Sequence, residues 1–189
     1  TILPRQTIAH PCVDIVVRGQ GELTVPELVK RLERGLPLKG MAGITYKEKR
    51  QIVENPDRPF SNVNEFPPSD YNSIDVEKYV IHDVSPRCID YISSRGCPHR
   101  CGFCIISRFY GRNWSGLKPE RVLDELEYLV DRYHVDGVKF EDDNFFVDKK
   151  RVRRICRGIV EQGLDILWNA SCRCEYLAGY DRDLLVAIR

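Results

Sequence analysis

The feature that most constrains the fold is a regular alternation of strand-like and helix-like segments, which begins at Cys88 and runs to the end of the chain. Short apolar runs at 89–93, 137–141 and 166–171 are each followed by a segment with apolar residues at helical spacing. Strands that alternate with helices in this way form βα units, in which the strands lie parallel and the helices pack outside them. The sequence therefore predicts an α/β fold with three βα units, whereas a closed barrel would need more of them.

The first two predicted helices have clear apolar faces. Pro119 suits the first turn of one helix, and Gly163 is suited to end the other. The residues expected to be buried are Val122, Leu123, Leu126, Leu129, Val130 and Tyr133 in the first helix and Val152, Ile155, Cys156, Ile159 and Val160 in the second. A third helical segment begins near Leu184 and reads like a helix cut short, so we expect a piece of a longer protein.

The region before Cys88 has a different pattern. An apolar run at 13–17 leads through the glycine turn 19–21 into apolar residues at helical spacing, up to Leu32. This order resembles the closing strand, turn and helix of a doubly wound domain, although an ordinary strand-to-helix turn explains it equally well.

A hairpin and a connector are predicted next. Short strand patterns at 43–46 and 51–53 flank a charged turn, and five prolines from Pro56 to Pro86 disfavour helix. The predicted parts of the chain are 1–40, 41–86 and 87–189.

Charge and cysteine content limit the function. The chain has 29 basic and 28 acidic side chains and no dense basic run, so nucleic acid is not an expected partner. No apolar run approaches the ~20 residues that a membrane span needs, and residues 1–10 do not resemble a secretion signal. We therefore expect a cytoplasmic protein. There, the crowding of three of the eight cysteines into eight residues favours a metal site over disulfides.

Cys97, Cys101 and Cys104 form the motif that carries chemistry. Three and then two residues separate them, directly after a predicted strand, so a single loop can wrap one inorganic cluster. Cysteine thiolates are the usual ligands of four-iron clusters, and a set of three leaves one iron open to a substrate or cofactor. Gly96 and Gly102 allow the tight turns of such a loop and leave amide groups free to donate to the cluster sulfurs.

Two other interpretations of this loop stay open. His99 could complete a zinc site with the three thiolates, although a ligand two residues from both Cys97 and Cys101 would strain so short a loop. The other alternative is three merely buried cysteines. A zinc site would make the chain a non-catalytic binding module instead of an enzyme.

The cysteine spacing, with Phe103 directly before the last cysteine, resembles the signature of the radical S-adenosylmethionine enzymes. In that family the open iron of a [4Fe-4S] cluster binds the amino and carboxylate groups of S-adenosylmethionine. The reduced cluster then cleaves the sulfonium bond, and a 5'-deoxyadenosyl radical abstracts hydrogen from substrate. The resemblance implies that Cys97, Cys101 and Cys104 hold the catalytic cluster and that Phe103 shields one side of it.

A wider resemblance, from about Asp14 to Glu175, is to the subgroup with a cobalamin-binding domain ahead of the radical domain. The segment 14–22 is similar to the end of that domain, although Gln20 stands where an acidic residue is commoner. The resemblance implies a partial (β/α) barrel, consisting of its first three βα units, preceded by the tail of a Rossmann-like domain and a proline-rich linker. Cobalamin is thus an implied cofactor, although the sequence has no Asp-x-His-x-x-Gly segment, which supplies the lower cobalt ligand in many members.

The resemblance also implies that the acidic end of the second strand, 141–145, faces bound S-adenosylmethionine. Asp142 and Asp143 are the favoured acceptors for its amino group. A helix cap is an equal alternative, because Asp and Asn commonly precede helices.

On the third strand, alternation places Asn169, Ser171 and Arg173 on one face, which is the better candidate for the mouth of the site. Arg173 matches an arginine that the family often carries here, and it could pair with the carboxylate of S-adenosylmethionine or with an acidic neighbour. A surface salt bridge is its alternative. Cys172 and Cys174 are too few for a second cluster and are expected in the core. The other cysteines expected there are Cys12, Cys88 and Cys156.

The implied function is methylation or ring formation at an unactivated carbon of a small-molecule or lipid-like substrate. A donor such as flavodoxin or ferredoxin would reduce the cluster. A methylthiotransferase is an alternative that would bring further cysteines ahead of Cys88, where only Cys12 occurs. A tetrapyrrole cyclase shares the same two-domain plan. Relatives often place arginines where this chain has 115–118, so its substrate is expected to differ from theirs.

Overall fold

A computed structural model describes residues 3–189, which form two compact units. One unit comprises the residues up to Phe66 together with Pro98–Asn113, and the other comprises Pro67–Cys97 and Trp114–Arg189. Each unit has its own sheet. No helix among the described residues is long and apolar enough to cross a membrane.

The amino-terminal unit is built on a three-stranded antiparallel sheet in the order β1-β2-β3. The turn from β2 to β3 places Lys49 and Arg50 at φ +47° and +68°, a positive pair that lets a two-residue turn follow the strand twist. Because β2 also pairs with β1, the predicted hairpin belongs to the same sheet as the strand before it. The predicted division of this region into 1–40 and 41–86 stays a prediction. The elements of this unit are α1 (Pro4–Ala9), β1 (Ile15–Val17), α2 (Gly21–Glu33), β2 (Ile44–Glu48), β3 (Gln51–Glu54), the 3-10 turn η1 (Val63–Glu65) and α3 (Ile106–Phe109).

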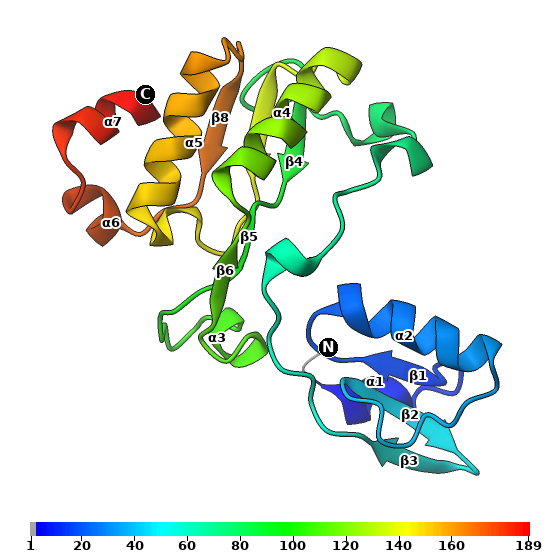
Figure 1. Cartoon of the computed structure of the whole chain (residues 1–189). Helices are drawn as coiled ribbons and strands as arrows, with labels where there is room; N and C mark the ends of the chain where they lie inside the picture. Colours follow the sequence, from blue (N-terminus) through cyan, green and yellow to red (C-terminus); the bar gives the residue numbers. More distant parts are fainter. Residues whose placement is uncertain (1–2) are drawn as a thin grey trace. The chain divides into compact units, whose positions relative to one another are not determined.

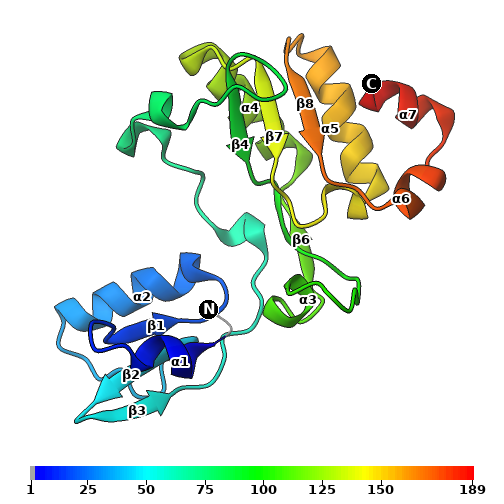
Figure 2. The same ribbon diagram turned by 180° about the vertical axis from the view of Figure 1, so that it is seen from behind.

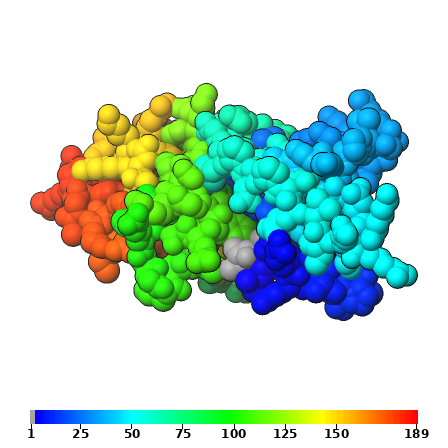
Figure 3. All heavy atoms as spheres, turned by 90° about the horizontal axis from the view of Figure 1, so that it is seen from below, coloured from blue at the N-terminus to red at the C-terminus, as the bar shows by residue number. Residues whose placement is uncertain are grey.

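A small core lies between α2 and this sheet. Leu28 of α2 packs with Met41, Ile44 and Tyr46, all of which are buried. Helix α1 lies against the hairpin, as the dark blue and cyan atoms of Figure 3 show. Burying these apolar side chains is what holds so short a sheet together.

The second unit is built on a parallel sheet in the order β4-β7-β8. Figures 1 and 2 show α4 and α5 side by side on one face of this sheet, while no helix of the unit covers the opposite face. The predicted mixed α/β fold is therefore confirmed. The elements of this unit are η2 (Tyr71–Ser73), η3 (Val76–Tyr79), β4 (Cys88–Tyr91), β5 (Ser94–Gly96), β6 (Trp114–Gly116), α4 (Pro119–Tyr133), β7 (Gly137–Phe140), η4 (Phe145–Val147), α5 (Lys149–Glu161), β8 (Leu167–Ala170), α6 (Cys174–Ala178) and α7 (Arg182–Ile188).

Alternation along the strands separates an apolar face from a polar one. On the covered face, the ring centroid of Phe140 lies 5.8 Å from that of Tyr91 and 5.6 Å from that of Trp168. The Tyr91 hydroxyl also donates to Glu125 of α4 over 2.8 Å. The opposite face carries a row of polar residues in register, which are Asp90, Lys139 and Asn169.

The contact between α4 and α5 depends on a glycine. Gly158 of α5 faces Leu123 of α4 so closely that a Cβ added to Gly158 would lie 2.2 Å from Leu123 Cδ1. The buried faces of both helices follow the predicted spacing, but Val160 is 72% exposed and was wrongly placed in the core. Because α5 turns Gly158 toward α4, the neighbouring Val160 points to solvent.

The strand predicted at 89–93 is shorter in the structure, and a further strand that was not predicted follows it. β4 ends at Tyr91, and the separate strand β5 pairs antiparallel with β6, so that Gly96 lies beside Trp114. This two-stranded ribbon brackets residues 97–113, the segment that holds the cysteine motif. The loop therefore leaves and rejoins the second unit at neighbouring points.

Candidate functional site

The cysteine loop is anchored next to its first cysteine by the acidic segment after β7. Gly96 ends β5 at φ +84°, a conformation that a side chain would strain. Its N–H donates to Asp143 Oδ2 over 2.7 Å. Asp143 is otherwise exposed, so one carboxylate oxygen holds the loop at the carboxyl end of β7.

Asp142 is buried, and the start of β5 occupies its carboxylate. Oδ1 accepts from the N–H of Ser93 over 2.6 Å, and Oδ2 accepts from the hydroxyls of Ser93 and Ser94 over 2.7 and 2.6 Å. Burial raises the pKa of Asp142, while these hydrogen bonds and the charge of Arg151 act to lower it. In this arrangement Asp142 holds the ribbon instead of offering an oxygen to a ligand.

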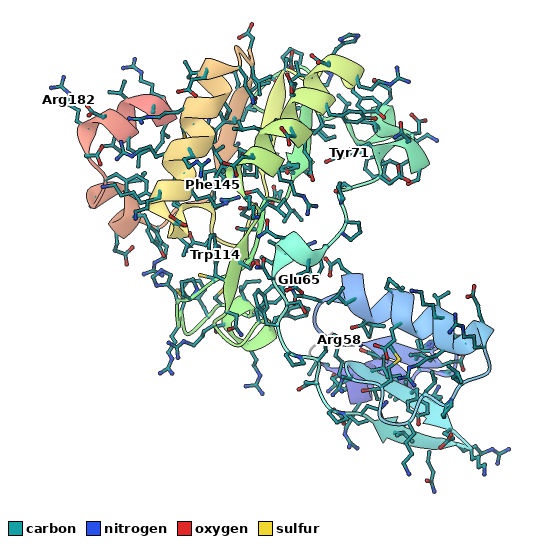
Figure 4. The ribbon with its side chains drawn as sticks, in the orientation of Figure 1. Arg58, Glu65, Tyr71, Trp114, Phe145 and Arg182 are labelled. Atoms are coloured by element: carbon teal, nitrogen blue, oxygen red, sulfur yellow. The ribbon has the colours of Figure 1, made fainter. Side chains whose placement is uncertain are left out.

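A buried arginine completes the network. Arg151 Nε donates to Leu117 O over 2.8 Å, and Nη2 donates to the carbonyl and hydroxyl oxygens of Ser93 over 3.0 and 2.7 Å. Its guanidinium lies 5.4 Å from the ring centroid of Phe145 and 5.9 Å from that of Trp114. Figure 4 labels these two aromatic side chains. Contacts of this kind between a cation and ring faces strengthen as water is removed.

Arg151 was missed by sequence reasoning, because it follows two lysines at the start of α5 and the pattern favours a solvated helix face. Its burial also explains part of the unusual segment 115–118. A Cβ on Gly116 would lie 2.7 Å from Arg151 Nε, so the guanidinium fills the space that a side chain at 116 would need. Burial lowers the pKa of Arg151, and the charge of Asp142 opposes that change.

Asn144 reaches the first cysteine itself. Its side-chain Nδ2 donates to Cys97 Sγ over 3.5 Å, and the residue is only 3% exposed. The Asn144 carbonyl accepts from Trp114 Nε1 of the ribbon over 3.1 Å. Tyr176 of α6 lies beside the same amide: burial raises the pKa of Tyr176, the Cys97 sulfur raises it further, and a hydrogen bond with Asn144 lowers it. Sequence reasoning favoured the two aspartates before Asn144 and missed the amide.

Cys101 and Cys104 lie in the tip of the loop. The N–H of Cys104 donates to Cys101 O over 3.0 Å, so the two cysteines flank a single tight turn. Phe103, between them, is 95% exposed, and its predicted shielding of the cofactor stays a prediction.

The donor set matches a cluster in its chemistry. All eight cysteines are free, and the three of the motif are half-buried thiols within one loop. Within residues 3–189, no three His, Cys, Asp or Glu side chains lie close enough together to hold a metal ion. The structure thus defines the anchor of Cys97 and the turn between the other two cysteines, and the cluster-binding role of the three stays a prediction.

Ser171 and Arg173, predicted on one face of the third strand, lie beyond the end of β8, in the segment between β8 and α6. Ser171 is exposed, and Arg173 forms an ion pair with Glu175, which is the surface alternative considered for it. Cys172 is half-buried, and its Sγ donates to Arg173 O over 3.1 Å. A role of Ser171 or Arg173 toward a cofactor stays a prediction.

The cysteines outside the motif are not all in the core. Cys88 and Cys156 are buried as predicted, and burial raises the pKa of Cys156 to about 11. Cys12 and Cys174 are exposed, so the core assignment was wrong for both. Both lie near the end of a short helix, where the spacing of apolar residues does not predict which side chains are buried.

Gln20 departs from the family pattern for a local reason. Its Nε2 donates to Ser61 O over 3.1 Å, and its Oε1 accepts from the N–H of Ser61 over 2.6 Å. The amide of Gln20 supplies both a donor and an acceptor to the backbone of one residue, whereas an ionised glutamate has no donor.

Comparison with known proteins shows related sequences, although no family model matches. An uncharacterized methyltransferase of Pyrococcus horikoshii is 42% identical over 175 residues, which cover 92% of this chain and 38% of the relative. An anaerobic magnesium-protoporphyrin IX monomethyl ester cyclase of Synechocystis sp. is 28% identical over 176 residues, which cover 93% of this chain and 35% of the relative. The chain therefore spans little more than a third of the length of these curated relatives.

A solved structure shares the fold. It is a radical S-adenosylmethionine methyltransferase, TsrM, from Kitasatospora setae, with cobalamin and a [4Fe-4S] cluster bound, and it matches 99% of this chain and 39% of its own, with a TM-score of 0.78 and 18% identity. The fold is therefore that of a radical S-adenosylmethionine enzyme. The predicted resemblance to the cobalamin-associated subgroup of these enzymes is confirmed by the relatives and by this fold.

Proposed function

We propose that the protein is a radical S-adenosylmethionine enzyme in which Cys97, Cys101 and Cys104 hold a [4Fe-4S] cluster. When bound, such a cluster supplies the electron that cleaves S-adenosylmethionine to a 5'-deoxyadenosyl radical. The chain's own part is to hold the three thiolates, leave one iron open and shield the site from water. The reaction proposed is methylation or ring formation at an unactivated carbon.

One observation carries this proposal: the root of the cysteine loop is fixed to the carboxyl end of β7. Asp142 holds the start of β5, and Asp143 holds Gly96, directly before Cys97. In α/β proteins, sites form at the carboxyl ends of parallel strands, because the loops that follow those strands meet there. The anchoring of Gly96, directly before Cys97, at this edge supports the proposal.

The finer architecture belongs to the same proposal. We interpret the β4-β7-β8 sheet with α4 and α5 as the first part of a (β/α) barrel and the amino-terminal unit as the tail of a Rossmann-like cobalamin-binding domain, with 41–86 between them. The polar row on the uncovered face of the sheet supports this interpretation, because the inner face of a barrel enzyme faces its site at the carboxyl ends.

Cofactors and partners are proposed from the same resemblance. Besides the cluster, we propose S-adenosylmethionine, with Phe103, Asp143, Ser171 and Arg173 near it, and cobalamin. The substrate is proposed to be a small or lipid-like molecule, and a flavodoxin or ferredoxin is the proposed electron donor in the cytoplasm. Asp142 is proposed as a residue that positions the loop, because its oxygens are already occupied.

The test is anaerobic reconstitution of the full-length protein. We expect about four iron and four sulfide per chain and formation of 5'-deoxyadenosine with reductant and S-adenosylmethionine. A variant with Cys97, Cys101 and Cys104 all changed to Ala should lose both, while the control Cys12→Ala, at an exposed thiol, should keep both. Bound tetrahedral zinc, or full iron content in the triple variant, would contradict the proposal.

A further inference from the structure

The side chain of Asn144 makes a contact that a purely structural role does not explain. Asn144 occupies the position before the turn η4, where an asparagine commonly caps the helix that follows, yet its side chain makes no capping hydrogen bond. Asp148 instead caps α5, accepting from the N–H groups of Lys150 and Arg151. The side-chain amide of Asn144 therefore does not act as the helix cap that its position suggests.

The orientation of this amide is set by its nitrogen. Nδ2 donates to Cys97 Sγ over 3.5 Å, whereas Oδ1 is buried and has no hydrogen-bond partner among residues 3–189. A buried acceptor without a donor costs stability, so an amide retained only for packing would be expected to satisfy its oxygen first. The nitrogen is thus the part of the amide that makes hydrogen bonds, one of them to the Cys97 sulfur, and Tyr176 lies beside it.

The backbone around Asn144 holds the amide in place. Its carbonyl accepts from Trp114 Nε1, and Trp114 pairs with Gly96, the residue before Cys97. The donor and the sulfur are thus fixed to the same ribbon. With 3% of the residue exposed, the bond lies in a region of low dielectric, where it has a larger electrostatic effect than in water.

We infer that Asn144 is a positioning residue that donates a hydrogen bond to the Cys97 sulfur and raises the reduction potential of the cluster. This inference rests on the proposed function. Reduction adds negative charge to the cluster and its sulfur ligands, so a donor to one sulfur stabilises the reduced form more than the oxidised form. Loss of the donor therefore makes the cluster harder to reduce.

The test compares Asn144→Leu, which keeps the side-chain shape and removes the donor, with wild type by redox titration monitored by EPR. Full-length proteins are reconstituted anaerobically and compared at equal iron content. We expect a more negative potential for Asn144→Leu and no shift for the control Asn113→Leu, which removes an exposed amide that donates to Tyr110 O. An unchanged potential in Asn144→Leu overturns the inference. If wild type binds no cluster, the proposed function itself fails, which is a separate outcome.

A second measurement needs no substitution at Asn144. Wild-type protein is labelled with side-chain ¹⁵N-asparagine, and the reduced cluster is examined by pulsed EPR for coupling to ¹⁵N. The inference requires a coupling that the unlabelled protein lacks, because Nδ2 donates to a cluster ligand. Absence of that coupling overturns the inference even if Asn144→Leu fails to assemble a cluster.

Discussion

Around the cysteine loop, single buried polar residues carry much of the local stability. Asp142 and Arg151 are each about 5% exposed, and both contact Ser93. When one partner of such a buried network is removed, the other charge stays buried without compensation. The resulting loss of stability is larger than the net stability that the intact network provides.

Arg151→Met should therefore lower the free energy of unfolding by roughly 2–4 kcal/mol. The substitution keeps much of the side-chain volume but leaves the Leu117 carbonyl without its donor, and it leaves Asp142 without a nearby cation. The Ser93 carbonyl loses one of its two donors and keeps the Leu117 N–H. Urea denaturation followed by circular dichroism measures the change.

The matched control lies on the same helix. Arg154 forms an exposed ion pair with Glu120, so Arg154→Met should cost less than about 1 kcal/mol. Equal losses for the two variants would show that burial of Arg151 contributes nothing to stability.

The sequence predicts the cysteine motif well because its three ligands lie close together in the chain. It does not predict Asn144 or Arg151, whose roles arise only when the ribbon packs against the segment after β7. An arginine that follows two lysines is predicted to be exposed to solvent. The sequence around Asn144 contains no pattern that distinguishes it from its acidic neighbours.

Among the secondary-structure elements, the α4–α5 pair is the most tightly fitted. Gly158→Ala should lower the free energy of unfolding by roughly 1–3 kcal/mol, because the new methyl group would overlap the Leu123 side chain unless that side chain or the helices shift. Thermal or urea unfolding measures the loss.

A suitable control is Gly179→Ala, at the end of α6, where the nearest atom to an added Cβ is 3.5 Å away and φ is negative. This variant should have a small effect by the same measurement. If Gly158→Ala is equally mild, the helices are less closely packed than the structure indicates.

Element prediction succeeded where periodicity is long. Helices α4 and α5 run for 15 and 13 residues, enough for their apolar faces to be recognised. The ribbon β5–β6 was missed because each strand has three residues, too few to display alternation, and because its pairing spans the whole cysteine loop.

For the molecule as a whole, acid should be destabilising. The Ser85 hydroxyl lowers the pKa of Asp136, and Lys149 lowers that of Asp181. A carboxyl group whose pKa is lower in the folded than in the unfolded protein stabilises the fold at pH values above its unfolded pKa. This contribution is lost as the pH falls through the pKa of the folded state. We expect the free energy of unfolding to fall from about pH 5 downward, as measured by urea titration at each pH.

Ser85→Ala tests the origin of this dependence. It removes the donor that lowers the pKa of Asp136 most, so stability should fall less steeply with acid than in wild type. Asp142 acts in the opposite sense: its raised pKa favours the fold at low pH, and this contribution is lost as pH rises. An unchanged acid profile in Ser85→Ala would contradict the assignment.

The paired hydrogen bonds between Gln20 and Ser61 have a consequence for how the amino-terminal unit tolerates its surroundings. Neither side chain carries a charge, so acid and added salt do not weaken these two hydrogen bonds. The same conditions weaken neighbouring ion pairs, such as the one between Arg58 and Glu27. The hydrogen bonds between the start of α2 and Ser61 should therefore persist at high salt concentration and at mildly acidic pH.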